Sequence, residues 1–124
     1  MPTAMISGHL DLTPQEFAEH YQPRINQAIS EGCDFIVADA RGADALAQEY
    51  LASRRRDSVF QVTVYHMFES PRTHHGDFPT QGGYSSDDER DAAMTTASDF
   101  DIAWVRPGRE KSGTARNIAR RNKL

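Results

Sequence analysis

The sequence predicts an α/β fold, a Rossmann-like three-layer sandwich with a small, mainly parallel sheet, formed by residues 1–124 as a single domain. Short apolar, β-rich segments alternate with segments of helical periodicity along the chain. Strands joined through helices favour right-handed parallel units with helices on both faces of the sheet. A chain of 124 residues is also long enough for one compact core.

Clear boundary signals mark the first strand and the first helix. Residues 3–7 form a short apolar run that ends at Gly8, as a buried strand before a turn does. Thr13 offers an N-cap hydroxyl, followed by a proline at the first helical position and a glutamate three residues after the cap. Apolar residues then recur at helical spacing, but Pro23 lacks a backbone donor, so we expect the helix to kink or split there.

Two further strands and a second helix follow. Residues 35–38 are too short and too β-rich for a helix and predict the second strand. Residues 43–54 carry an apolar face at helical spacing, and residues 59–68 alternate and predict the third strand. Residues 69–84 contain two prolines and three glycines. They predict a long irregular segment, either a lid over a binding site or a disordered loop.

The C-terminal part supplies two helices around one strand. Ser86 is followed three residues later by Glu89, a capping-box pattern that predicts a helix to about residue 97. Residues 100–105 predict the fourth strand, which a Pro-Gly pair ends. Ser112 then opens a last helix that ends in a basic tail.

Composition limits the classes of partner and compartment. Fourteen Lys and Arg against 18 Asp and Glu give a net charge of -4, which argues against broad binding to nucleic acid or to an anionic membrane. Cys33 is the single cysteine, and neither a signal peptide nor an apolar run of ~20 residues is present, so we expect a cytoplasmic protein. His74 and His75 lack spaced partner ligands, so neither a metal nor another cofactor is expected.

The loops that follow the strands carry the candidate site, because ligands of such folds bind at the carboxyl ends of the strands. Residues 112–114 (Ser-Gly-Thr) offer free N–H groups, two hydroxyls and the positive end of a helix, which suits a phosphate. Seven of the fourteen basic residues lie from Arg106 onward. A capped helix with a solvated basic tail remains the alternative interpretation.

A second loop-to-helix junction spans residues 41–44. Gly42 permits close backbone approach, and Asp44 either accepts from a sugar hydroxyl or caps the helix. His9 either contacts a phosphate or base or is an exposed loop histidine, and Tyr84 could stack on a base. The predicted ligand-binding residues are Ser7, Gly8, His9, Asp39, Arg41, Gly42, Ala43, Asp44, Tyr84, Arg106, Ser112, Gly113, Thr114 and Asn117.

Four segments together resemble one family over nearly the whole chain. GHLDLT, ARGADALA, GGYSSDDERDAAM and KSGTARNI resemble the SLOG superfamily of LOG- and DprA-like Rossmann nucleotide-binding proteins, most closely its small stand-alone bacterial and phage members. The resemblance implies a nucleotide-type ligand with its phosphate at residues 112–114 and its sugar and base beside Gly8, Arg41, Gly42 and Asp44. It also implies a homo-oligomer.

One position departs from that family. LOG-type enzymes resemble one another in a Gly-Thr-x-x-Glu motif whose glutamate acts at the glycosidic carbon, and here Asn117 stands at that position. An amide neither ionises nor attacks usefully, so Glu89 or Asp91 would have to supply the carboxylate. Glu89 has the alternative role of a capping-box residue.

Three functions therefore remain as hypotheses. The first is a binding or sensing module for a nucleotide or a nucleotide-derived phosphorylated ligand, which suits Asn117 and the absence of an obvious nucleophile. The second is a nucleoside-phosphate N-glycosidase (phosphoribohydrolase) or transferase that uses Glu89 or Asp91. The third is a structural or interaction protein with a vestigial pocket.

Overall fold

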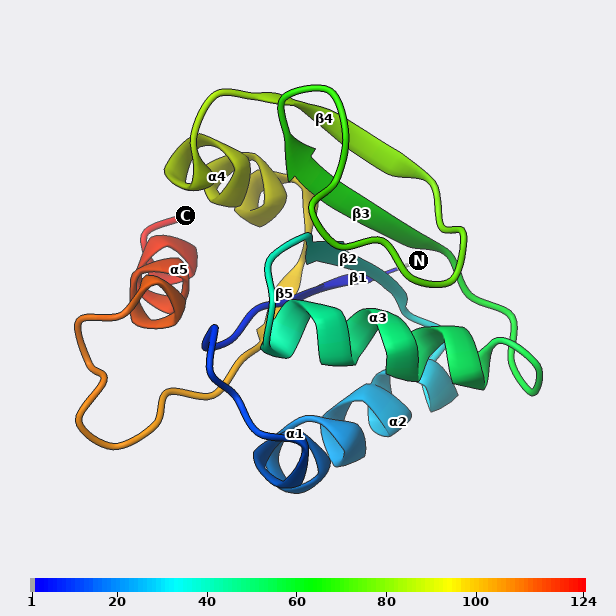
Figure 1. The fold of residues 1–124 in the computed structure, drawn as a ribbon. Helices are drawn as coiled ribbons and strands as arrows, with labels where there is room; N and C mark the ends of the chain where they lie inside the picture. The colour runs from blue at the N-terminus through cyan, green and yellow to red at the C-terminus, as the bar shows by residue number, and fades with distance from the viewer. Residues whose placement is uncertain (1) are drawn as a thin grey trace.

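The computed structural model describes residues 2–124 and contains a five-stranded sheet with helices on both faces (Figure 1). The strand order is β4-β3-β2-β1-β5, and every neighbouring pair is parallel. The strands are β1 (Thr3–Ile6), β2 (Asp34–Ala38), β3 (Val62–Met67), β4 (Thr80–Tyr84) and β5 (Phe100–Ile102). The helices are α1 (Pro14–His20), α2 (Gln22–Ser30), α3 (Ala43–Arg54), α4 (Asp87–Ala97) and α5 (Gly113–Asn122). The predicted fold class is confirmed.

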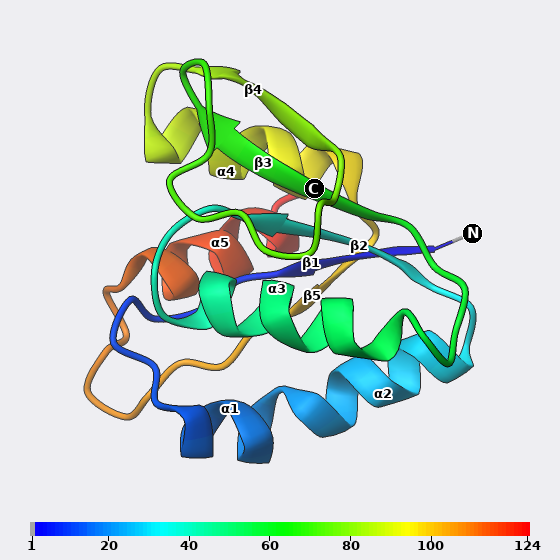
Figure 2. The same cartoon turned by 45° about the vertical axis from the view of Figure 1, so that its right-hand side comes forward.

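The side chains of the strands alternate between two hydrophobic clusters, one on each face of the sheet. Helices α1, α2 and α3 cover one face, and α4 and α5 lie on the other (Figure 2). The larger cluster joins Ala4, Ile6, Phe35, Val37, Val62 and Val64 to apolar residues of the first three helices. The smaller cluster consists of Met5, Ile36, Ala38, Tyr65 and Met94.

The helical segment around Pro23 is split, as predicted. The capping box at Thr13 starts α1, which ends at His20 with Tyr21 as its C-cap, and α2 then begins with Pro23 in its first turn. The Tyr21 ring is fully buried. Its hydroxyl donates to the Ser7 carbonyl at 2.8 Å and accepts from the Trp104 amide at 3.0 Å. Through these two hydrogen bonds, Tyr21 at the break between α1 and α2 fixes both helices to the segments that follow β1 and β5.

The prediction of one irregular segment over residues 69–84 is wrong. Thr80–Tyr84 form the edge strand β4, and the rest of the segment is anchored by the fully buried Gln48, whose amide binds the Thr73 carbonyl and the His75 amide. The strand was not predicted because it contains Gly82, and glycine is disfavoured in strands. The backbone of Gly82 packs against His66, where an added Cβ would lie 2.0 Å from the ring, so a glycine fills a position that strand propensity disfavours.

Three strands are shorter than predicted, and β1 differs least, since it ends at Ile6 rather than at residue 7. β3 begins at Val62 rather than at residue 59, and Val59 is almost fully exposed. β5 ends at Ile102 because the amides of Trp104 and Arg106 leave the sheet to donate to Tyr21 and His9. Within residues 2–124, none of the helices combines the length and the apolar character that a membrane crossing requires.

The order of the strands creates a reversal point beside β1. The chain adds β2, β3 and β4 on one side of β1, and α4 then leads back to β5 on the other side. Connections from the ends of β1 and β5 consequently diverge to opposite faces of the sheet. Such a switch point opens a crevice at the carboxyl ends of the strands, where ligands of open α/β sheets bind.

Candidate functional site

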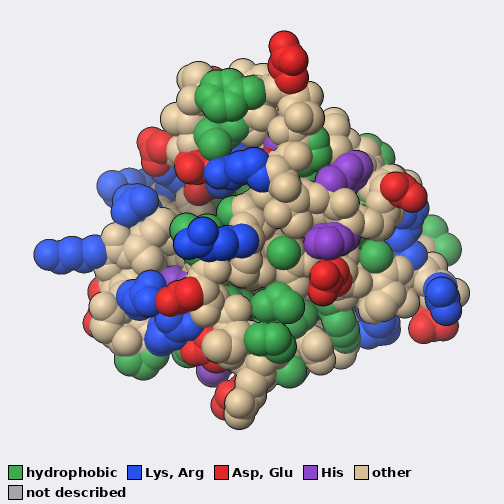
Figure 3. All heavy atoms as spheres, in the orientation of Figure 1, with side chains coloured by type: hydrophobic (Ala, Val, Ile, Leu, Met, Phe, Trp, Pro, Cys, Tyr) green, Lys and Arg blue, Asp and Glu red, His purple; other side chains and the backbone are tan. Residues whose placement is uncertain are grey.

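A cavity of about 510 Å³ lies at this switch point. The loops after β1 and β2 line it, together with α4 and the first turn of α5. In Figure 3, basic side chains gather on the side of the molecule where α5 lies. The predicted site residues that line the cavity are Ser7, Gly8, His9, Arg41, Asp44, Asp91, Ser112, Gly113, Thr114 and Asn117.

The first turn of α5 presents unpaired donors to the cavity. The Ser112 hydroxyl caps the helix by accepting from the Ala115 amide at 3.2 Å. Within residues 2–124, the amides of Gly113 and Thr114 donate to no acceptor, and the hydroxyl of Thr114, a residue only 4% exposed, has no partner. Arg116 lines the cavity from the same turn. Free amides, a hydroxyl and a guanidinium group at a helix N-terminus suit an anion.

Asp44, in the first turn of α3, is the buried carboxyl group of the cavity. It is 6% exposed, and its Oδ2 accepts from the Ala40 amide at 3.1 Å, while Oδ1 has no partner among the described residues. Burial raises the pKa of Asp44 to about 7, against the opposing effect of the Arg90 charge. Near neutral pH this carboxyl group is therefore both a proton donor and an acceptor.

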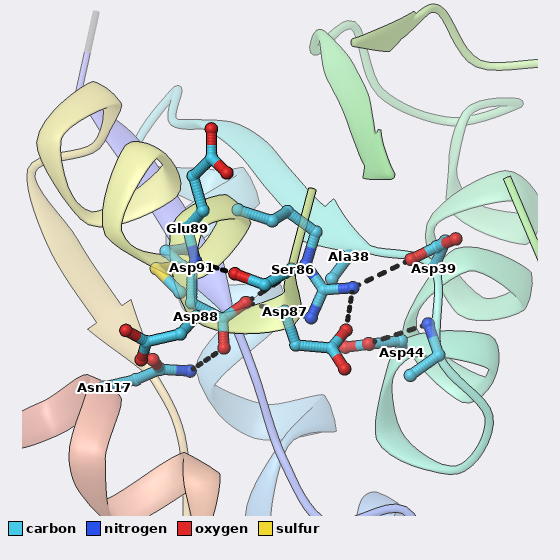
Figure 4. Close-up of polar contacts among 12 residues, drawn as sticks. Ala38, Asp39, Asp44, Ser86, Asp87, Asp88, Glu89, Asp91 and Asn117 are labelled. Carbon is cyan, nitrogen blue, oxygen red and sulfur yellow. Dashed lines mark hydrogen bonds and ion pairs between the residues drawn. The ribbon is translucent and has the colours of Figure 1, made fainter. Parts of the chain in front are cut away.

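The α4 wall of the cavity is built around a buried arginine. Arg90 is 5% exposed, and its Nη1 lies 2.9 Å from a carboxylate oxygen of Asp39 and 2.9 Å from one of Asp87 (Figure 4). Its Nη2 lies 2.9 Å from Asp91. The side chain of Arg72 lines the cavity and reaches the same Asp39 at 3.0 Å. The two arginines of this wall, Arg72 and Arg90, are therefore paired with aspartates of the protein itself.

Asp39 stands at the centre of that network, at the end of β2. Its side chain is fully buried, so it lies beneath the cavity rather than in it. Burial opposes ionisation, but hydrogen bonds from Arg72 and the charge of Arg90 outweigh it and lower the pKa of Asp39. The prediction that Asp39 lines the ligand site is corrected: this carboxylate holds α4 and the segment before β4 in place.

Asn117 joins α5 to α4. Its Nδ2 donates to Asp91 Oδ2 at 3.2 Å, and its Oδ1 accepts from Arg120 at 2.7 Å (Figure 4). The carboxylate of Asp91 is thus beside the position where LOG-type sequences carry glutamate. Asp91 and Asn117 both line the cavity.

The loop after β1 contributes His9, whose ring is buried. Its Nε2 accepts from the Arg106 amide at 2.9 Å, so the neutral ring carries its proton on Nδ1. Burial lowers the pKa of His9, and the charges of Arg106 and Arg109 act in the same direction. The exposed-loop interpretation of His9 is therefore wrong.

Arg106 itself does not line the cavity. Its guanidinium group binds Glu16 at 2.6 Å and Asp11 at 3.1 Å, which fixes the loop before α5 to the start of α1. Hydrogen bonds from Arg106 and Thr13 lower the pKa of Glu16 to about 2. Arg109 lines the cavity instead and pairs with Asp11 at 2.8 Å.

Glu89 points away from Asp91 and Asn117 in Figure 4 and is not among the residues that line the cavity. Its Oε2 accepts from the Ser85 amide at 3.1 Å and from the Ser85 hydroxyl, and these bonds lower the pKa of Glu89. The capping interpretation holds in a modified form, because the carboxylate reaches Ser85 rather than the Ser86 backbone. The geometry does not support Glu89 as a catalytic group.

Three further predicted residues, Gly42, Ala43 and Tyr84, are not among those that line the cavity. Gly42 has a φ of 74°, and an added Cβ would lie 2.3 Å from the Leu10 carbonyl oxygen. The Ala43 amide donates to the His9 carbonyl at 3.1 Å, so it is not free for a ligand. Tyr84 stacks on Tyr65, with 6.1 Å between ring centroids, and lies outside the cavity.

Sequence reasoning missed several residues that line the cavity. They are Met5, Ile6, Leu10, Asp11, Ala38, Ala40, Arg72, Asp87, Arg90, Met94, Arg109 and Arg116. Arg90 was detectable only as a basic residue three positions after Asp87, because its buried partner Asp39 lies 51 positions earlier in the chain. Within residues 2–124, no three His, Cys, Asp or Glu side chains are grouped as a metal ion requires.

No protein-family model, curated protein or solved structure matches the chain. The resemblance to the SLOG superfamily therefore stays a prediction.

Proposed function

We propose that this chain binds a nucleotide or a nucleotide-derived phosphorylated ligand in the cavity, as a binding or sensing module. The observation that carries the proposal is the unpaired first turn of α5. Two amides and the Thr114 hydroxyl have no protein partner there within residues 2–124, next to Arg116. A phosphate in the cavity can accept from all of these donors, as anions do at helix N-termini.

The remaining lining suits the rest of such a ligand. Met5, Ile6, Ala38 and Met94 provide an apolar surface for a base, and the free oxygen of Asp44 can accept from a sugar hydroxyl. The volume of about 510 Å³ lies within the ~300–1,000 Å³ of typical small-molecule sites. The resemblance to the SLOG superfamily points to the same class of ligand.

A second candidate function is a nucleoside-phosphate N-glycosidase, or phosphoribohydrolase, or a transferase. The contact between Asp91 and Asn117 favours it, because a carboxylate of α4 reaches the position of the missing glutamate. Against it, Arg90 and Asn117 already bind the two oxygens of Asp91, so both oxygens are engaged by the protein itself. Binding without turnover is therefore the primary proposal.

A panel of nucleoside mono-, di- and triphosphates tests both candidates. We expect melting shifts with at least one member and no release of base by chromatography, because bound ligand stabilises the folded state. Thr114→Val should remove the shift, whereas Thr96→Val, which changes an exposed hydroxyl on α4, should keep it.

Other outcomes separate the hypotheses. Base release that disappears in Asp91→Asn would establish the glycosidase or transferase. Neither a shift nor a product would reject the pocket hypothesis for these ligands and favour a structural or interaction protein with a vestigial pocket.

A further inference from the structure

The hydroxyl of Ser7, directly after β1, is buried without a hydrogen-bond partner. Within residues 2–124, two buried side-chain atoms lack a partner, the hydroxyl oxygen of Ser7 and Nε of Arg121. The other two nitrogens of Arg121 make four hydrogen bonds, so that side chain is held within the protein. Ser7 has a single polar side-chain atom, is 7% exposed and lines the cavity. Because buried polar groups are nearly always bonded, a ligand in the cavity is a fitting partner for this hydroxyl.

The backbone of Ser7 is fixed on both sides, so its hydroxyl is the one group of this residue that is left for a ligand. The Ser7 amide continues the pairing of β1 with β5 by donating to the Ile102 carbonyl at 3.2 Å. The Ser7 carbonyl accepts from the buried Tyr21 hydroxyl at 2.8 Å. Contact with a ligand then requires only rotation about one side-chain torsion. A group held in this way loses little conformational freedom when a ligand binds.

The surroundings of Ser7 are apolar. Side chains alternate along β1 and the pairing with β5 continues through Ser7, so Ser7 faces the same side of the sheet as Met5. Met5, Ala38 and Met94 belong to the smaller hydrophobic cluster on this side, and all three are buried and line the cavity. We call these three residues and Ser7 the floor of the cavity. Its one polar side chain is the Ser7 hydroxyl.

The positive charges that suit a phosphate lie outside this floor. Four of the five arginines that line the cavity are exposed, and the buried fifth, Arg90, is paired with aspartates. Transfer of a charged phosphate from water to an apolar surface costs far more than transfer of a neutral ring. The floor therefore favours a neutral heterocycle, and the phosphate is favoured at the exposed arginines and the first turn of α5.

We propose that the Ser7 hydroxyl hydrogen-bonds to the base of the nucleotide, whose ring lies against Met5, Ala38 and Met94. This inference rests on the proposed function and adds the residue that distinguishes a nucleotide from its sugar phosphate. A hydroxyl both donates and accepts, so it can pair with a ring nitrogen, a carbonyl oxygen or an amino group of a base. Ser7 contributes to affinity for the base and not to affinity for the phosphate.

Calorimetric titration of the full chain tests this assignment with two kinds of ligand. The first are the four common nucleoside 5′-monophosphates, and the second is ribose 5-phosphate, which has the same sugar and phosphate but no base. Ser7→Ala should weaken binding of the tightest-binding nucleotide about 3–10-fold, because it removes one hydrogen bond. It should leave the affinity for ribose 5-phosphate unchanged.

Ser98→Ala is the matched control. Ser98 is as buried as Ser7 but lies outside the cavity, and its hydroxyl donates to the Met94 carbonyl at 2.7 Å and accepts from Arg121. Ser98→Ala should lower the melting temperature of the unliganded protein by about 3–6 °C and leave nucleotide affinity unchanged. Ser7→Ala should not lower the melting temperature, because the hydroxyl that it removes has no partner to lose.

The outcomes distinguish this inference from the proposed function. An equal loss of affinity for ribose 5-phosphate in Ser7→Ala would place the hydroxyl at the sugar or phosphate and overturn the base contact, with the proposed function intact. Unchanged nucleotide affinity in Ser7→Ala would overturn it too. So would a melting temperature lowered as far as in Ser98→Ala, because the hydroxyl would then have a partner in the unliganded protein. If the native protein bound none of the four nucleotides, the proposed function itself would be rejected, and the base contact with it.

Discussion

The two helices that line the cavity differ in whether their polar groups have partners within the protein. On α4, Arg90 is almost fully buried, and aspartates of the protein itself pair its charge. On α5, the amides of Gly113 and Thr114 and the Thr114 hydroxyl have no partner within residues 2–124.

We infer from this difference that the polar groups of α4 stabilise the fold, whereas those of the first turn of α5 are available to bind a ligand. Changes in the α4 network should lower the free energy of unfolding and act on binding only indirectly. Changes in the first turn of α5 should lower ligand affinity and leave stability nearly unchanged.

The largest expected effect is on the α4 side. Asp39→Ala leaves the buried Arg90 without its most buried partner, and such a broken pair destabilises a protein by about 3–5 kcal/mol. Urea denaturation measures the loss. The matched control is Asp88→Ala, because Asp88 is exposed and pairs with Arg120 at the surface, where ion pairs contribute ~0–1 kcal/mol. Similar losses in both variants would refute the stabilising role of this network.

The second effect is a dependence of stability on pH, caused by Asp44 of α3, which lines the cavity beside α4 and α5. The pKa of Asp44 is raised from 3.8 to about 7 in the folded state, so the folded protein binds the extra proton between these values. Stability should therefore fall as the pH rises from about 4 to 7. Asp44→Asn removes this dependence and should raise the free energy of unfolding at pH 8 by about 2–4 kcal/mol. Urea denaturation at pH 5 and pH 8 measures it, and equal pH slopes in both proteins would contradict the assignment.

The sequence predicted those features of the fold that depend on neighbouring residues. Signals that act over three or four residues were readable: the hydroxyls of Thr13, Ser86 and Ser112 all cap helices as predicted. Short apolar runs located β1 and β2, and alternation of apolar residues located β3. The edge strand β4 was not readable, because Gly82 is there to fit against His66, a contact that only the folded sheet creates.

The site was predictable where backbone chemistry defines it and unpredictable where long-range pairing does. Residues 112–114 were found because a Ser-Gly-Thr helix start has intrinsic anion-binding groups. The pair of Arg90 and Asp39 was missed because no local pattern links positions 51 residues apart. Helix geometry could have separated Glu89 from Asp91, since residues two apart point about 200° away from each other.

The third effect is on the α5 side and should change affinity without changing stability. Gly113→Pro removes one unpaired amide donor at the first helical position, where proline is well accepted, and Ser112 before it is already extended, with ψ of 167°. Loss of one hydrogen bond to a charged group should weaken phosphate binding about 10–100-fold. Isothermal titration calorimetry measures the affinity, and thermal melting monitors the fold.

The control at this position is Gly113→Ala, which keeps the amide and meets only the end of the flexible Arg116 side chain at 3.5 Å. It should bind phosphate as the native protein does. If the proline and alanine variants bound phosphate equally well, the amide of Gly113 would not contact the ligand. The inference that the first turn of α5 binds the ligand would then be wrong.

The smallest expected effect separates two neighbouring carboxylates of α4. Glu89→Gln should leave ligand affinity and any turnover unchanged, because this side chain bonds to Ser85 outside the cavity. Asp91→Asn should alter both, because it weakens contacts with Arg90 and Asn117 inside it. Calorimetry and base release, measured on the two variants side by side, check this. A larger loss in Glu89→Gln than in Asp91→Asn would show that α4 turns its other face to the ligand, and the assignment of its stabilising wall would then be wrong.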